Sequence, residues 1–133
     1  MNPAHDMVAQ RAGFRCEYCR APAALFNFPF EVEHVYPGSR GGSDNLGNLA
    51  LSCRACNAFK GAAVRGTDPP TGSECDLFHP RRHRWEDHFQ FDRDRAETIG
   101  TTQIGRATVV SLRLNHVGQV RARREWMRLD QYP

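Results

Sequence analysis

Two pairs of cysteines in this chain have the spacing of metal ligands. Two residues separate Cys16 from Cys19 and Cys53 from Cys56, and 33 residues lie between the pairs. Two thiolates at this spacing can bind one ion from a single tight turn, and a second such turn completes a tetrahedron. Because four thiolates leave no open coordination position, the pattern predicts a structural zinc site. In a chain of 133 residues, such a site would supply much of the folding free energy.

Other interpretations of the cysteines are redox-active dithiols, zinc storage, or thiols without a chemical role. A disulfide framework fits poorly, because the chain has five cysteines and an odd number leaves one unpaired. Cys75 lies outside both pairs, so we expect it to be an ordinary small side chain.

The overall composition is that of one soluble domain. The chain is 40% hydrophobic and 25% charged, with a mean hydropathy of −0.62 and no apolar run of membrane-spanning length. The first residues show neither a basic start nor an apolar stretch, so we expect no secretory signal and a cytoplasmic protein.

The charge of the chain favours a polyanionic partner. Seventeen arginines and one lysine stand against 15 acidic residues, and the excess of positive charge lies in residues 1–66 and 101–133. A guanidinium group matches the geometry of phosphate oxygens, although arginine in place of lysine also fits simple coding bias.

The pattern of the first half predicts elements that position the cysteines. We expect a helix over residues 6–13, a strand of a hairpin over 30–35, a long polar loop over 38–48 and a helix over 53–63. A loop this polar in a small domain usually carries function.

The second half is expected to follow a turn-rich linker at residues 67–73. Its pattern predicts a helical turn at 82–88, a small hairpin from residues 89–92 and 97–100, and two helices over 103–114 and 117–129.

The segment that contains the cysteine pairs resembles the His-Asn-His (HNH) endonucleases. The resemblance rests on Glu33-His34-Val35-Tyr36-Pro37, Gly41-Gly42, Asn48-Leu49 and the run from Cys53 to Gly61, which contains Cys-x-x-Cys-Asn-x-x-Lys. It covers about Cys16 to Gly61. These elements must agree in order and spacing, which makes the resemblance specific.

The resemblance implies a role for each motif residue. His34 would be the general base that deprotonates water, Glu33 and Asn57 would hold a catalytic divalent ion, and Asn48 would brace the long loop. Asn57 stands where the family name has its last histidine, an accepted variant. An imidazole can accept a proton near neutral pH, and carboxylate and amide oxygens suit magnesium or manganese. Lys60 would either contact a phosphate or be a solvated helix end.

The resemblance also implies a fold and an activity. The fold would be α+β. Residues 1–66 would form a ββα-metal core that the four-cysteine zinc site stabilises. From the residue pattern rather than the resemblance, we expect residues 67–133 to form a small hairpin and helical tail packed on that core, in one structural domain overall. The activity would be metal-dependent hydrolysis of DNA, by nicking or double-strand cleavage, which leaves 5′-phosphate and 3′-hydroxyl ends.

Substrate contacts and alternatives complete the set of expectations. RNA is not excluded as a substrate, a homodimer through the last helix is an open option, and no membrane partner is expected. The leading alternative function is an inactive, zinc-stabilised nucleic-acid-binding module. The basic residues expected to contact phosphates, or else to form solvated faces, are Lys60, Arg40, Arg81, Arg82, Arg84, Arg121 and Arg124.

Overall fold

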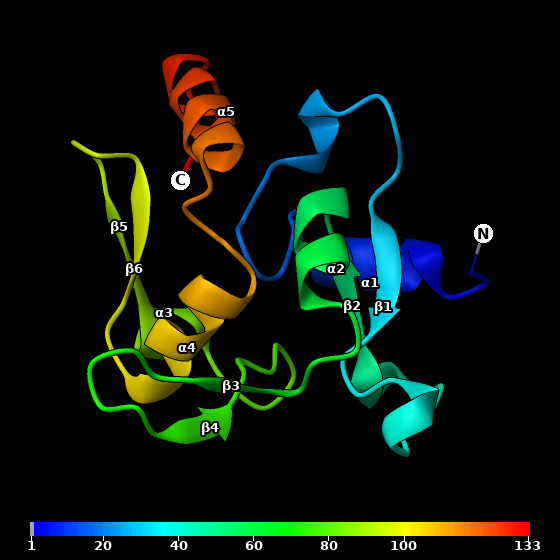
Figure 1. Cartoon of the computed structure of the whole chain (residues 1–133). Coiled ribbons are helices and arrows are strands. Elements are labelled where there is room, and N and C mark those ends of the chain that lie inside the picture. The colour runs from blue at the N-terminus through cyan, green and yellow to red at the C-terminus, as the bar shows by residue number, and fades with distance from the viewer. Residues whose placement is uncertain (1) are drawn as a thin grey trace.

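A hairpin and a helix form the centre of the first half (Figure 1). The computed structural model of the protein describes residues 2–133. Strand β1 (Glu31–His34) pairs antiparallel with β2 (Leu49–Ser52), with Glu33 opposite Ala50, and helix α2 (Arg54–Lys60) follows at once. The sequence therefore predicted the strand and the helix correctly, with ends one to three residues shorter than expected.

Helix α1 (His5–Arg11) packs on the hairpin and buries Val8 and Ala9. It begins at His5, one residue earlier than predicted, and Asn2 just before it accepts a hydrogen bond from the backbone nitrogen of Ala4. Every residue of β2 is buried. Strand β2 is thus enclosed by α1, α2 and the segments that follow α1, whereas β1 keeps Glu31 exposed and Val32 and His34 partly exposed.

The loop between β1 and β2 contains two short 3-10 helices, η2 (Gly38–Arg40) and η3 (Leu46–Asn48). A further 3-10 helix, η1 (Ala23–Leu25), lies between the first cysteine pair and β1. The polar loop predicted for residues 38–48 is therefore a folded segment with its own hydrogen bonds.

The prediction that residues 67–73 form a linker is wrong. These residues form the end of β3 (Arg65–Thr67) and the turn that leads to β4 (Glu74–Asp76), its antiparallel partner. Asp68 in this turn is fully buried and accepts hydrogen bonds from both Nε and Nη2 of Arg106, at 2.8 and 3.1 Å. The turn is therefore tied to the second half rather than free to act as a spacer.

The remaining elements lie where the sequence places them. Helix α3 (Trp85–His88) leads into the hairpin of β5 (Phe89–Asp92) and β6 (Glu97–Gly100), followed by α4 (Gln103–Ser111) and α5 (Val117–Arg128). The fold is a small α+β arrangement with three two-stranded sheets among residues 2–133.

One hydrophobic core draws on both halves of the chain. Tyr18 and Leu51 lie in the same buried cluster as Phe78, Phe89 and Leu112. Across residues 2–133, no helix has the length and apolar character needed to span a membrane.

Candidate functional site

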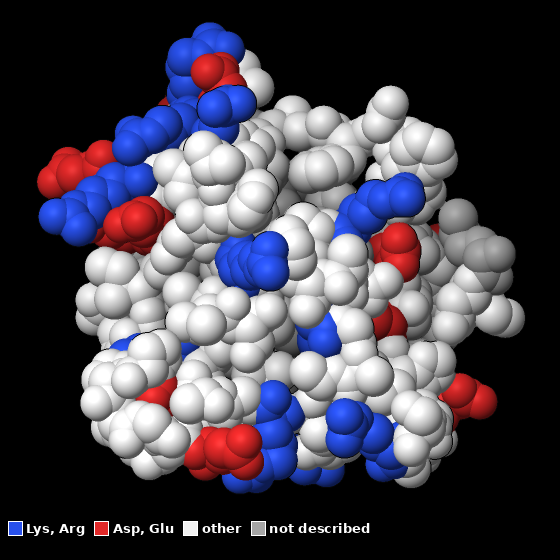
Figure 2. Space-filling model, in the orientation of Figure 1, with Lys and Arg blue, Asp and Glu red and all other residues white. Residues whose placement is uncertain are grey.

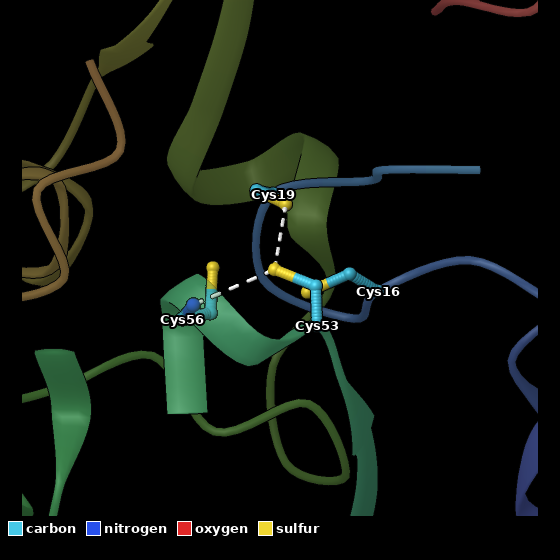
Figure 3. Close-up of side chains that lie close together, drawn as sticks. All are labelled: Cys16, Cys19, Cys53 and Cys56. Atoms are coloured by element: carbon cyan, nitrogen blue, oxygen red, sulfur yellow. Dashed lines mark hydrogen bonds between the residues drawn. The ribbon is translucent and has the colours of Figure 1, made fainter. Parts of the chain in front are cut away.

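The four paired cysteines come together in one cluster. Cys16 and Cys19 lie in the turn after α1, whereas Cys53 caps the N-terminus of α2 and Cys56 lies in its first turn. Their sulfur atoms point toward one another (Figure 3) and all lie within 4.8 Å of each other. All four residues are buried. The predicted grouping of these thiols is confirmed.

The geometry of this cluster fits a tetrahedral zinc ion. With Zn–S bonds of about 2.3 Å, the sulfurs of a tetrahedron lie about 3.8 Å apart. The Sγ atoms of Cys19 and Cys53 are 3.7 Å apart. The four sulfur ligands and their burial are those of a closed structural site, which leaves no position for a substrate.

The thiols also influence each other's ionisation. Burial raises the pKa of the Cys16 thiol, but hydrogen bonds from Cys19, Cys53 and Cys56 outweigh burial and hold that pKa well below its usual value. Hydrogen bonds with Cys16 and Cys19 raise the pKa of the Cys56 thiol. The cluster therefore favours a thiolate, which is the form that binds metal.

Residues from the second half of the chain contact the cysteine cluster and the turn that carries Cys16 and Cys19. The Tyr132 hydroxyl donates a hydrogen bond of 2.8 Å to the backbone oxygen of Cys19. The side-chain nitrogen of Gln119 lies 3.9 Å from Sγ of Cys56, and Nε1 of Trp85 donates to the backbone oxygen of Tyr18. Sequence reasoning missed these contacts, because no local pattern links positions 63 to 113 residues apart.

His34 is the last residue of β1 and has a side chain that is 35% exposed. Its Nε2 lies 2.7 Å from Oδ1 of Asp44 in the long loop. When Nε2 carries the proton and donates it to this carboxylate, Nδ1 is the ring nitrogen able to accept a proton. Asp44 was not identified from the sequence, because an exposed acidic residue in a polar loop carries no specific signal.

Asn48 ties the long loop to the end of β1. Its Oδ1 accepts a hydrogen bond from the backbone nitrogen of Tyr36, and its Nδ2 donates to the backbone oxygens of Tyr36 and Ser43, at 2.9, 2.9 and 2.7 Å. Gly42 packs against the same place, since a Cβ there would lie 1.5 Å from the Tyr36 oxygen. These contacts hold the segment that carries Asp44 beside His34.

Glu33 is buried in a cluster with Tyr18 and Lys60. The Tyr18 hydroxyl donates a hydrogen bond to Oε1 of Glu33, and Nζ of Lys60 lies 3.7 Å from its Oε2. Burial raises the pKa of Glu33 and lowers the pKa of Lys60, while the attraction between the two opposes both shifts. Burial also raises the pKa of Tyr18 well above its usual value.

The expectation that Lys60 is a solvated helix end or a phosphate contact is wrong. Its side chain is 1% exposed, and Nζ donates a hydrogen bond of 2.9 Å to the backbone oxygen of Val35. Lys60 is buried because the end of α2 packs against β1. The position of a lysine at the end of a predicted helix does not reveal this packing.

Asn57 lies on the face of α2 that meets β1, three residues before Lys60. Its Nδ2 donates a hydrogen bond to Oε2 of Glu31, which is exposed at the start of β1. Glu33 on β1 and Asn57 on α2 thus lie on elements that pack against each other. The side chain of Glu33 is hydrogen-bonded to Tyr18, and that of Asn57 to Glu31.

Of the arginines near the loop, Arg40 and Arg82 are exposed. Arg40 donates from Nε to the backbone oxygen of Ala62, and the guanidinium of Arg82 lies 5.3 Å from the ring centroid of Tyr36. Arg81 instead forms a half-buried ion pair with Glu17, and burial lowers its pKa to about 10. The expectation of a phosphate contact at Arg81 is therefore not supported.

The other arginines lie farther along the chain. Arg84 precedes α3 and is exposed, as is Arg121 on α5. Arg124 on α5 donates to the backbone oxygens of Asp94 and Arg95 at the tip of the β5–β6 hairpin. Figure 2 shows basic and acidic side chains mixed over α5 and this hairpin tip, so the side of α5 seen in this view is not uniformly basic.

An apolar cavity of about 470 Å³ lies between α2 and α5, lined by residues that include Phe26, Phe59 and Trp126. None of the motif residues Glu33, His34, Asn48 or Asn57 lines it. These residues lie instead on β1, at the end of the long loop and on α2.

Comparison with known proteins supports the same segment. Residues 16–63 match the family model of the HNH endonucleases. No curated protein and no solved structure matches the chain significantly. The matched residues contain the four clustered cysteines, β1, the braced loop and α2, which confirms the resemblance over this segment.

Proposed function

We propose that this chain, with an HNH endonuclease segment at residues 16–63, is a metal-dependent endonuclease that hydrolyses phosphodiester bonds in DNA. The observation that carries the proposal is His34. It is accessible at the end of β1, paired with the carboxylate of Asp44 and held by a loop that Asn48 braces.

His34 would act as the general base. Its Nδ1 accepts a proton from water while the water oxygen attacks phosphorus, and the carboxylate of Asp44 stabilises the imidazolium that forms. The P–O3′ bond breaks, the leaving oxygen takes up a proton from solvent water, and His34 then releases its proton to solvent. The products are a 5′-phosphate and a 3′-hydroxyl.

Glu33 and Asn57 would hold the catalytic magnesium or manganese ion. Their carboxylate and amide oxygens are hard donors of the kind these ions prefer. Glu33 also accepts a hydrogen bond from Tyr18 and lies 3.7 Å from the ammonium group of Lys60, so the ion would share its carboxylate with these two neighbours. When bound, the ion would stabilise negative charge on the phosphate and on the leaving oxygen.

The cysteine cluster would bind zinc in a structural role. It joins the turn after α1 to the start of α2, which is the helix that carries Asn57. A zinc ion there fixes α2 against the hairpin and so maintains the distance between Asn57 and β1.

Two exposed arginines are well placed to hold the substrate. Arg40 lies in the same loop as Asp44, and Arg82 stacks on Tyr36, two residues after His34. Contacts of guanidinium groups with the phosphate backbone predict binding that weakens as salt increases, without sequence specificity. Arg84 and Arg121 are secondary candidates.

The test is cleavage of supercoiled plasmid by zinc-loaded protein with magnesium, with manganese or with EDTA. We expect metal-dependent nicking that His34→Ala abolishes. His116→Asn is a matched control, because His116 is an exposed histidine outside the site and asparagine retains its role as the N-cap of α5. Equal nicking by His34→Ala would overturn the assignment of the base. DNA binding without cleavage under any condition would favour the inactive binding module.

A further inference from the structure

The cluster of Tyr18, Glu33 and Lys60 contains two charged groups in an enclosed place. The side chains of Lys60 and Glu33 are 1% and 5% exposed. Nζ of Lys60 is shared between Oε2 of Glu33, at 3.7 Å, and the backbone oxygen of Val35, at 2.9 Å. Lys60 therefore contacts the residues on both sides of His34 in the sequence, Glu33 before it and Val35 after it.

An enclosed ion pair of this kind is a costly way to stabilise a fold. Two charges lose their hydration, and a pair of apolar side chains in the same place is often as stable or more stable. The distance of 3.7 Å is also longer than the 2.7–2.9 Å of a strong charged hydrogen bond. Lys60 thus balances the charge of Glu33 while its closest hydrogen bond goes to the backbone.

We propose that Lys60 is an internal cation that competes with the catalytic divalent ion for the carboxylate of Glu33. This inference rests on the proposed function, in which Glu33 is a ligand of that ion. Lys60 is then a positioning residue that sets the affinity for the ion, and it touches neither water nor phosphate in the reaction.

The physical basis is competition between two positive charges for one carboxylate. A divalent ion bound to Glu33 would lie within a few ångströms of the Lys60 ammonium, and like charges at that distance repel strongly in an enclosed site. The backbone oxygen of Val35 gives the ammonium a second acceptor, so Lys60 can move away from Oε2 without losing every partner. Removing the charge of Lys60 should therefore leave Glu33 more available to the ion.

A purely structural ion pair makes the opposite prediction. If Lys60 only stabilises the fold, its replacement loosens the contact between β1 and α2. Helix α2 also carries Asn57. The affinity for the ion would then fall or stay the same. The direction of the change separates the two roles.

The experiment is a titration of zinc-loaded protein with manganese, with free Mn²⁺ followed by electron paramagnetic resonance. The thiolates retain zinc, since manganese binds such sites far more weakly. We expect Lys60→Met to bind Mn²⁺ about tenfold more tightly than wild type. Lys60→Arg retains the positive charge, so we expect it not to bind Mn²⁺ more tightly than wild type.

Tyr18→Phe is a further control, because it removes the other partner of Glu33 without changing the charge. We expect it to change the affinity by less than Lys60→Met. A folded Lys60→Met protein that binds Mn²⁺ no more tightly than wild type would overturn the proposal. If Lys60→Met does not fold, Lys60→Gln gives the same test with a polar side chain that can still donate to Val35.

Two further results separate this inference from the proposed function. Glu33→Gln should lose most of the Mn²⁺ affinity, and unchanged affinity would show that Glu33 is not a ligand, which would overturn the inference. Wild-type protein that binds Mn²⁺ and shows the Lys60 effect, but does not cleave DNA, would contradict the proposed nuclease alone.

Discussion

Replacement of Gly42 by alanine should impair catalysis through the position of the loop. The added Cβ would lie 1.5 Å from the backbone oxygen of Tyr36 and 2.9 Å from Nδ2 of Asn48. Ordinary contacts begin at 3.4 Å, so the Cβ and the oxygen must separate by about 1.9 Å (3.4 minus 1.5 Å). The oxygen belongs to the backbone, and no side-chain rotation can relieve the clash.

The movement acts on hydrogen bonds that hold the site. The same Tyr36 oxygen accepts from Asn48, and Asn48 also binds Ser43, next to Asp44. Overpacking of this kind costs about 1–3 kcal/mol of stability. A shift of about 1 Å in a catalytic group can reduce the rate about a hundredfold. We therefore expect a loss of nicking rate of about a hundredfold in a protein that remains folded.

The assay compares nicking rate, urea-unfolding midpoint and zinc content in Gly42→Ala and in Gly47→Ala. Gly47 is the matched control, because it lies in the same loop and a Cβ there meets no atom within 4 Å. We expect Gly47→Ala to behave as wild type. If Gly42→Ala cuts DNA at the wild-type rate, the reasoning that the packed loop positions His34 is wrong.

Two further predictions concern stability. Cys56→Ser should reduce zinc content and lower the melting temperature. Cys75→Ser should change neither, because Cys75 lies outside the cluster. Zinc analysis and thermal melts followed by circular dichroism check both expectations. Burial is the main cause that lowers the pKa of His79 to about 4, so between pH 6.5 and pH 4 the unfolded chain holds a proton that the folded protein does not. Stability is therefore fully present above pH 6.5 and lost as the pH falls toward 4, by about 1–3 kcal/mol after allowance for partial solvation. Urea melts of wild type and His79→Gln at pH 7.5 and pH 5 test this; an equal pH dependence in the two proteins would refute it.

Local patterns predicted much of this fold. The hairpin of residues 89–92 and 97–100 occurs at the predicted positions, because alternation of side chains around a short charged turn is a signal within one segment. The cysteine cluster was also predictable, since the spacing within each pair restricts the geometry of the turn.

The errors concern residues whose environment is set by distant partners. The sequence places Asp68 in a linker, yet the residue is fully buried and bonded to Arg106, 38 residues away. Lys60 reads as a helix end in water, yet β1 covers it. Charged side chains give the same sequence signal whether they meet solvent or a buried partner, so only the tertiary structure distinguishes the two.

Chemical rescue of His34→Ala tests the central claim most directly. Imidazole in solution can replace the missing side chain as a base when a cavity remains beside the bound phosphate. We expect nicking by zinc-loaded His34→Ala protein to be undetectable alone and to return in a saturable way as imidazole is added with magnesium or manganese. Wild-type nicking should not respond to the same additions. Equal nicking by wild type and His34→Ala at every imidazole concentration would contradict the proposal that His34 is the general base of an endonuclease.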